Sequence, residues 1–399
     1  MKRLTLSLLI ITSFLILNII GCSKAVLDPT SSTLCGDIVS ATILSNRIAD
    51  PNIPDYIVTC DVNVKAPLTI QQGVIIAVKQ NFKIVINASG SIMATGSSDS
   101  MIVIKGETDS KGFWYGMIIE SNNPENKLNY VKIQNGGSPT NIETANLSIM
   151  AKSKIVITNS TFTKSIKNGI FVAGYDYETI ESLTGFSNNY ITDNDLYPIS
   201  ITASDVKNMS ANSQMTKNGT DRIQVRGGDL EGNVVWNKTA VPLLVSIGVE
   251  IGSVANTGNL TINEGMNIEF ESSTYLRNYN STNGAKGFIN ILGSSASHVV
   301  LKAASQIAGG WEGITVLSTN AQNNIEYAEI LFGGQYSIVN KTKGNISCGD
   351  VSQDGNIKMK NSIISNSSDY GIHIRRGPGF LPDASNTFTG NLAGNYHKD

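Results

Sequence analysis

The sequence predicts an all-β fold of the solenoid type, in which short strands repeat along one axis. The first observation is a long internal repeat, because residues 112–118 (GFWYGMI) return as residues 309–315 (GGWEGIT). Trp311 follows Trp114 by 197 positions (311 against 114), and later landmarks keep the same separation. A register kept this well over Gly- and Asn-rich segments is typical of stacked repeats.

The second observation is a series of short β-branched runs from about residue 55 onward. Examples are residues 74–76, 84–86 and 102–104, and clusters of Gly, Asn, Asp or Ser separate them. Short strands with closely spaced turns indicate an all-β fold. A sandwich or a barrel is the default alternative for such a pattern.

The third observation is a recurring cadence that favours a parallel β-helix. Residues 157–162 lead to residues 168–172, and residues 359–364 lead to residues 370–374 by the same steps. Each unit has an apolar strand, an Asn turn, another apolar position and then Gly-Ile. Asn tolerates left-handed backbone at tight corners, and stacked Asn side chains can form a ladder. Coils of about 20-odd residues would divide each copy into about eight turns.

These segments resemble the right-handed parallel β-helix repeats of pectate-lyase-like proteins and, more narrowly, the β-helix lipoproteins of Bacteroidetes. The resemblance rests on residues 68–74 (LTIQQGV), 114–116 (WYG), 128–131 (LNYV), 260–265 (LTINEG) and 311–313 (WEG). It implies one fold over about residues 55–399 and leaves the function open. The fold hosts polysaccharide lyases and glycoside hydrolases as well as proteins without known activity.

We expect a first β-helix copy at residues 55–230 and a second at residues 231–399. One continuous rod, with the second copy stacked on the first, is the favoured arrangement. The alternative is two abutting rods joined near residues 203–240, where the stretch 208–220 lacks apolar runs.

The N-terminus predicts export. Lys2 and Arg3 precede an apolar run at residues 4–20, which is the pattern of a signal peptide over residues 1–21. A retained membrane anchor is the alternative, because the run has about the length of a minimal spanning helix.

Residues 19–22 (IIGC) resemble the lipobox of bacterial lipoproteins. The resemblance implies cleavage before Cys22, lipidation of that cysteine and attachment to a bilayer through its acyl chains. Ser23 follows the cysteine, which in Gram-negative lipoproteins is compatible with the outer membrane, on its periplasmic face or at the cell surface. Residues 22–54 are then expected to form a polar tether.

Three cysteines remain after Cys22. An exported protein may form disulfides, and Cys35 with Cys60 is the nearest pair, which would leave Cys348 free. Three unrelated thiols are the alternative. No spacing of Cys and His predicts zinc, since His298, His373 and His397 lie far apart in the sequence.

The candidate ligand or metal positions are acidic residues two apart: Asp176 with Glu178, and Asp193 with Asp195. Residues at this spacing share one face of an extended strand and could help bind calcium. Asp193 and Asp195 equally fit a turn before the next strand, because Asp is frequent in turns.

Trp114 and Trp311 are candidate sugar-stacking residues, since aromatic faces suit the apolar faces of sugars. The flanking glycines also fit a second interpretation, in which both tryptophans pack into the core.

The composition excludes one class of partner. Charged residues make up 16% of the chain and the formal net charge is −2, so no nucleic acid is expected. The expected function is a non-catalytic binding or structural surface for polysaccharide or another envelope component, without a cofactor or metal. The alternative is a polysaccharide lyase or glycoside hydrolase. Two carboxylates with an Arg or Lys on one face would favour the enzyme.

Overall fold

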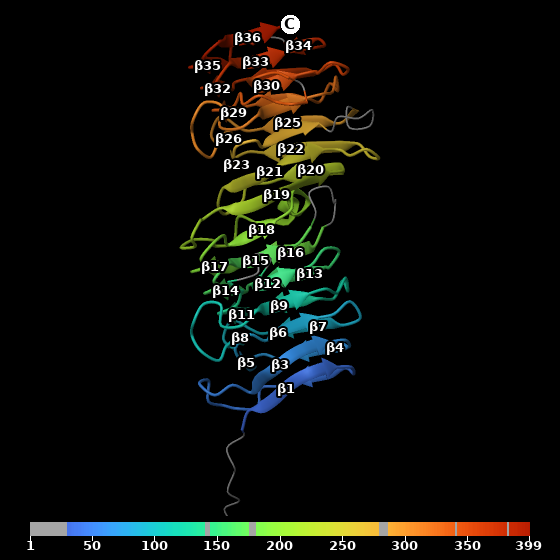
Figure 1. Ribbon diagram of the computed structural model, residues 1–399, viewed down its shortest axis with the longest axis vertical. Helices are drawn as coiled ribbons and strands as arrows, with labels where there is room; N and C mark the ends of the chain where they lie inside the picture. Colours follow the sequence, from blue (N-terminus) through green and yellow to red (C-terminus); the bar gives the residue numbers. More distant parts are fainter. Residues whose placement is uncertain (1–29, 140–143, 175–180, 279–285, 340, 381–382) are drawn as a thin grey trace, which may run out of the picture.

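The computed structural model describes residues 30–139, 144–174, 181–278, 286–339, 341–380 and 383–399. They form one elongated stack of strands, with β1 near one end and β36 at the other (Figure 1). Three sheets of 24, 6 and 6 strands run along the stack. Every pairing between named strands in these residues is parallel, which confirms the predicted parallel β-helix. Within the same residues, no helix is long and apolar enough to cross a bilayer.

The first copy supplies half of the large sheet and one complete small sheet. Its strands in the large sheet are β1 (Ser32–Ile38), β3 (Tyr56–Val64), β5 (Ile75–Val78), β6 (Lys83–Ile86), β8 (Ile102–Gly106), β9 (Gly116–Ile119), β11 (Val131–Gln134), β12 (Ala145–Ile149), β14 (Thr161–Thr163), β15 (Asn168–Val172), β17 (Tyr190–Thr192) and β18 (Ile199–Ile201). The small sheet contains β2 (Thr42–Leu44), β4 (Pro67–Ile70), β7 (Ser91–Thr95), β10 (Lys127–Asn129), β13 (Ile155–Thr158) and β16 (Leu183–Ser187).

The second copy repeats this plan. Its strands in the large sheet are β19 (Ile223–Leu230), β21 (Leu243–Ile251), β23 (Asn267–Phe270), β24 (Tyr275–Asn278), β26 (Val299–Ala303), β27 (Gly313–Val316), β29 (Ala328–Leu331), β30 (Gly344–Cys348), β32 (Ile363–Ser365), β33 (Tyr370–Ile374), β35 (Thr387–Thr389) and β36 (Gly394–Lys398). Its small sheet contains β20 (Gly232–Trp236), β22 (Gly258–Asn263), β25 (Phe288–Leu292), β28 (Asn324–Glu326), β31 (Asn356–Lys360) and β34 (Gly379–Phe380).

The core is a column of aliphatic side chains that stack from coil to coil. In β8, Ile102 and Ile104 are fully buried while Val103 between them is only partly buried. Ile104 pairs in register with Ile76 on one side and Ile133 on the other. Each such side chain contributes roughly 1.5–3 kcal/mol by leaving water, so the alternation along each short strand determines which face points inward.

Asparagines form the tight corners, as the sequence predicts. Asn159 and Asn361, at equivalent points of the two copies, both have left-handed backbone, with φ of 51° and 53°. Side-chain amides also connect the coils, because Asn146 donates to Asn194, two coils further on, at 3.3 Å, and Asn194 donates to Asn218 at 2.9 Å. These bonds satisfy polar groups that the corner buries.

The coils are fewer than expected, because each small sheet has six strands and each copy therefore has about six turns where about eight are predicted. Leu68 pairs with Ile92, 24 residues later, as the predicted length of 20-odd residues requires, while Ala94 pairs with Leu128, 34 residues later. The predicted number of turns is therefore wrong, and the predicted coil length is exceeded at some turns. The extra residues lie in corner loops, which can lengthen without disturbing the strands.

The β-helix begins earlier than expected, so the predicted tether over residues 22–54 is too long. Strands β1 and β2 lie inside that range, and β1 pairs with β3. Cys35 and Cys60 form a disulfide between these two strands, whereas Cys348 is a buried free thiol. The disulfide holds an otherwise half-exposed first strand against the next coil.

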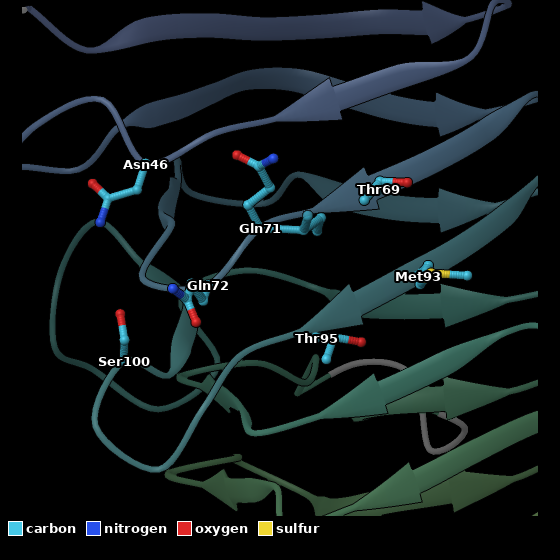
Figure 2. Close-up of a pocket in the computed structure, with 8 residues that line it drawn as sticks. Asn46, Thr69, Gln71, Gln72, Met93, Thr95 and Ser100 are labelled. Carbon is cyan, nitrogen blue, oxygen red and sulfur yellow. The ribbon is translucent and has the colours of Figure 1, made fainter.

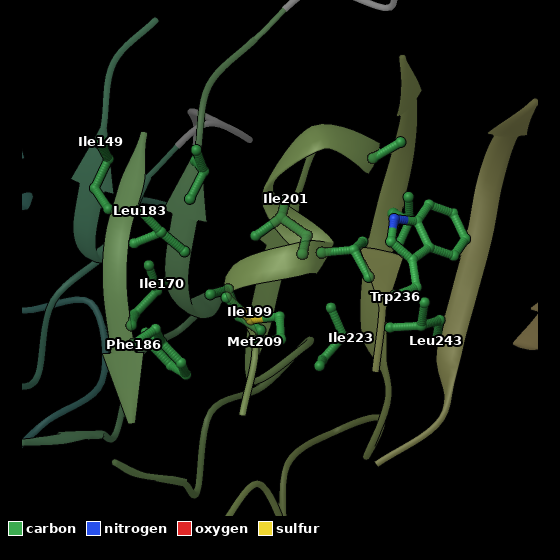
Figure 3. Close-up of a cluster of buried hydrophobic side chains, with 14 of the residues drawn as sticks. Ile149, Ile170, Leu183, Phe186, Ile199, Ile201, Met209, Ile223, Trp236 and Leu243 are labelled. Carbon is green, nitrogen blue, oxygen red and sulfur yellow. The ribbon is translucent and has the colours of Figure 1, made fainter. Parts of the chain in front are cut away.

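The two copies form one continuous rod. Strand β18 pairs with the start of β19, which pairs with β21, so the large sheet passes through the expected junction at residues 203–240 without a break. Buried side chains likewise continue from Ile199 through Ile223 to Leu243 (Figure 3).

A short 3-10 helix, η1 (Ala203–Asn208), separates the two small sheets at this junction. Asp205 in η1 is fully buried, and its Oδ1 accepts the backbone N–H groups of Ser182 and Leu183, both at 2.9 Å. The carboxyl thus satisfies donors at the start of β16, where no further strand follows in that sheet.

Candidate functional site

A polar cleft lies at a corner of the first copy, beside the ends of β4 and β7 (Figure 2). It has a volume of about 630 Å³. Amides and hydroxyls dominate its lining, which is Asn46, Thr69, Ile70, Gln71, Gln72, Met93, Thr95 and Ser100. Such groups can both donate and accept hydrogen bonds, as sugar hydroxyls require.

The backbone at Gly73 holds this cleft in shape. Gly73 has a φ of 77°, and its N–H donates to the carbonyl of Ser100 at 3.1 Å. A Cβ at this position would lie 2.6 Å from both the Asn46 amide and the Ser100 hydroxyl. Only glycine therefore lets the two cleft walls approach each other here.

The second copy has a cleft at the equivalent corner, also of about 630 Å³. Its lining is Asn237, Lys238, Asn263, Glu264, Leu292 and Ser297. Asn263 and Glu264 stand where the first copy has Gln71 and Gln72. The shape is repeated while the chemistry differs, because Lys238 and Glu264 bring charges to the second cleft.

The two clefts lie well apart along the rod. Between β4 and β22, the small-sheet side of the stack contains β7, β10, β13, β16, η1 and β20. At about 4.8 Å per coil, the separation is roughly 34 Å. Two such clefts could hold separate segments of one long polymer.

The two tryptophans are not sugar-stacking residues. Trp114 and Trp311 are both fully buried, and each indole N–H donates to a backbone carbonyl, of Gln134 at 2.8 Å and of Leu331 at 3.0 Å. Trp311 stacks on Phe270 with ring centroids 4.1 Å apart. The prediction that they stack on sugars is wrong because no ring face reaches solvent; the alternative, core packing, is correct.

The acidic candidates of the first copy surround a lysine. Asp193 and Asp195 lie 2.9 and 2.7 Å from the ammonium group of Lys111, which comes from a different coil. Asp193 has left-handed backbone, with a φ of 57°, and both residues lie in the turn between β17 and β18. The turn interpretation is therefore correct, the shared face of a strand is not formed, and the cation that the two carboxylates bind is the ammonium group of Lys111. Asp176 and Glu178 lie outside the described residues.

The structure assembles a charged cluster on the second copy that sequence analysis missed. Glu250 of β21 and Arg277 of β24 are register partners, and the guanidinium donates to both carboxylate oxygens at 2.6–3.1 Å. Arg277 also lies 3.7 Å above the Tyr275 ring. Asp229 pairs in register with Glu250, so it lies in the same row.

Two carboxyl groups in and beside this cluster, those of Asp229 and Glu312, have raised pKa values. Burial raises the pKa of Asp229 to about 6, and the nearby charges of Glu250 and Glu231 act in the same direction. Burial also raises the pKa of Glu312, whose carboxyl is close enough to feel Arg277 and Glu250. Perturbed carboxyl groups beside an arginine are frequent at functional sites, although structural ion-pair networks produce them too.

The cluster is absent from the first copy. The register partners Asn63 and Val85 stand at the positions of Glu250 and Arg277, and Tyr115 stands at the position of Glu312. A comparison of the two copies after alignment would have singled out these differences. The alignment requires the coil register, however, which varying loop lengths hide.

Two histidines far apart in the sequence also meet. His373 of β33 and His397 of β36 are register partners on neighbouring coils. Their rings are 5.0 Å apart, and both ring Nε2 atoms face Asp399. His298 lies elsewhere on the rod and contacts Glu329.

No family model matches the chain, and no curated protein has a significantly similar sequence. The fold alone therefore defines the class of this protein, a parallel β-helix built from two copies of a long repeat.

Proposed function

We propose that this chain is a non-catalytic, lipid-anchored β-helix protein whose corner clefts bind polysaccharide. The observation that carries the proposal is the repetition of the polar cleft at equivalent corners of both copies. In the first cleft, the exposed amides of Gln71 and Gln72 offer donors and acceptors without a charge to desolvate. A long exposed solenoid face suits an extended ligand.

The proposed location is the bacterial outer membrane, with attachment through lipidated Cys22. Its support is the signal-like residues 1–21 and the lipobox-like ending, which lie outside the described residues. The Cys35–Cys60 disulfide fits an oxidising compartment. We also propose that the chain belongs with the pectate-lyase-like β-helices and the Bacteroidetes lipoproteins that it resembles.

A glycan array probed with the chain lacking residues 1–21 tests the binding proposal. The Gln71→Ala/Gln72→Ala double variant removes two cleft amides, each worth about 1 kcal/mol in a bound complex, so affinity should fall about tenfold or more. Gln322→Ala, an exposed amide outside the cleft, serves as the matched control. Failure to bind any glycan, or equal binding by the double variant, would contradict the proposal.

A second candidate function is cleavage of a glycosidic bond at the charged cluster. The observation in its favour is that Asp229, Glu250 and Glu312 share one face with Arg277. A glycoside hydrolase requires two carboxyl groups at one bond, one of them an acid with a raised pKa, and burial raises the pKa of Asp229 to about 6. However, the side chains of Glu250 and Arg277 are only 13% and 14% exposed and bind each other, which favours a structural role.

Product release from polysaccharides tests this second function. A hydrolase should release reducing ends at a rate that falls at least about 100-fold in Glu250→Gln. Glu125→Gln, which changes an exposed carboxylate outside both clefts and the charged cluster, should leave the rate unchanged. If no polysaccharide that the array identifies as a ligand is cut, the non-catalytic function stands.

A further inference from the structure

Strands β33 and β36, which pair with each other at the end of the rod, present an imidazole pair on their outer surface. Ile372 and Ile374 of β33 are fully buried, so His373 between them points away from the core. The parallel register places His397 of β36 directly beside it. The Tyr370 ring stacks on the His397 ring with centroids 4.6 Å apart and meets His373 edge-on. These contacts limit the orientations available to both rings.

A carboxylate completes a three-sided arrangement. Oδ1 of Asp399 lies 2.9 Å from Nε2 of His373 and 3.3 Å from Nε2 of His397. One ligand atom from each residue lies within 4.8 Å of the other two. Among the described residues, this is the one group of three or more His, Cys, Asp or Glu side chains that meets this condition.

We propose that His373, His397 and Asp399 form a binding site for a divalent transition-metal ion such as Zn²⁺. Imidazole nitrogen and carboxylate oxygen bind zinc at about 2.0–2.2 Å, which places neighbouring ligand atoms of a tetrahedron roughly 3.3 Å apart. The two Nε2–Oδ1 separations are close to that edge, and the two imidazole ligand atoms lie within 4.8 Å of each other, so a metal requires the two rings to come within about the same edge length. Three protein ligands leave one position for water or for a ligand group.

The donor set determines which metal is expected. Two imidazoles favour Zn²⁺, Cu²⁺ or Ni²⁺, whereas Ca²⁺ takes six to eight oxygen ligands and would find one carboxylate here.

Two features of the surroundings limit the affinity. The positive charge of Arg375 acts on the Asp399 carboxylate and opposes a bound cation. The buried Nδ1 atom of His373 has no hydrogen-bond partner in the described structure. No second hydrogen bond therefore determines which nitrogen of the ring carries the proton. A missing outer partner of this kind typically weakens metal binding by roughly 10- to 100-fold. We therefore expect a reversible site, removable by a chelator.

Calorimetric titration with ZnCl₂ tests the site, on chain purified without a polyhistidine tag and freed of metal by EDTA. The wild type should bind one equivalent, and CaCl₂ should give no heat of binding. His397→Gln should weaken zinc binding at least about tenfold, because it removes one of three ligands. Its side chain is 41% exposed, so the fold should survive, as circular dichroism without metal would check.

His298→Gln is the matched control, because His298 faces a single carboxylate, of Glu329, at 3.2 Å. It should bind zinc as the wild type does. Co²⁺ provides an independent readout, since a tetrahedral nitrogen and oxygen site absorbs visible light and His397→Gln should lose that band. Absence of stoichiometric zinc binding by the wild type, or unchanged affinity in His397→Gln, would overturn the proposal.

Discussion

The buried carboxyl of Asp205 should make the rod less stable as the pH rises. Burial raises the pKa of Asp205 from 3.8 to about 6, and the hydrogen bonds from Leu183, Ser182 and Thr202 offset only part of that effect. The folded chain therefore holds this proton more tightly than the unfolded chain does. The resulting stabilisation is fully present below about pH 4 and is lost as the pH rises through about 6.

The size of the stability change follows from the rise in the pKa of Asp205 from 3.8 to about 6. At 1.36 kcal/mol per unit, the change in the free energy of unfolding is about 3 kcal/mol. Asp205→Asn should remove this pH-dependent contribution to the free energy of unfolding. It should keep both hydrogen bonds to Oδ1, since the amide oxygen can accept the N–H groups of Ser182 and Leu183. The amide nitrogen can donate to Thr202, which lies 3.3 Å from the other carboxylate oxygen.

Urea denaturation at pH 4 and pH 7.5 measures the effect. The stability of Asp205→Asn minus that of the wild type should increase by about 3 kcal/mol between the two pH values. The contributions of all other carboxyl groups to the pH dependence cancel in this difference. Asp99→Asn, in an exposed loop, serves as the control, and its stability relative to the wild type should be the same at both pH values, which is a flat difference. A flat difference for Asp205→Asn as well would refute the reasoning that burial dominates at this residue.

Three further perturbations test the packing of the rod. Cys60→Ser opens a disulfide that links residues 25 apart, so the free energy of unfolding should fall by about 3 kcal/mol, and added reductant should then have no further effect on the denaturation midpoint. Trp311→Ala should cost about 3–5 kcal/mol in the same assay, because it leaves a cavity beside Phe270; a loss below 1 kcal/mol would mean that the ring is not a core residue. Arg277→Met should cost about 3 kcal/mol by leaving Glu250 without its cation, and adding Glu250→Gln should recover part of that loss; no recovery would show that the pair is not coupled.

The chemistry of single residues made much of the fold predictable. Asn159 and Asn361 mark corners because asparagine accepts left-handed backbone, and both adopt it. Alternation around Ile102 and Ile104 identifies the buried face of a strand without any tertiary information. The number of coils was not predictable, since loops of different length separate Leu68 from Ile92 and Ala94 from Leu128.

The candidate sites were predictable only in part. The frequency of Asp in turns correctly predicted a turn at Asp193 and Asp195, yet Lys111, which binds both carboxylates, comes from another coil. His373 and His397 are 24 residues apart, which is one coil at this end of the rod, so a known coil length would have paired them. Without that length, the two histidines look unrelated.

The sequence by itself determined the all-β class, the internal repeat and the direction in which most strand residues point, because these depend on local periodicity and backbone preference. Only the tertiary structure decided which polar side chains meet. In a parallel β-helix the neighbour of a residue lies one whole coil away, and variable loops set that distance. The burial of Trp114, the pairing of Glu250 with Arg277 and the convergence of His373 and His397 on Asp399 all follow from that register.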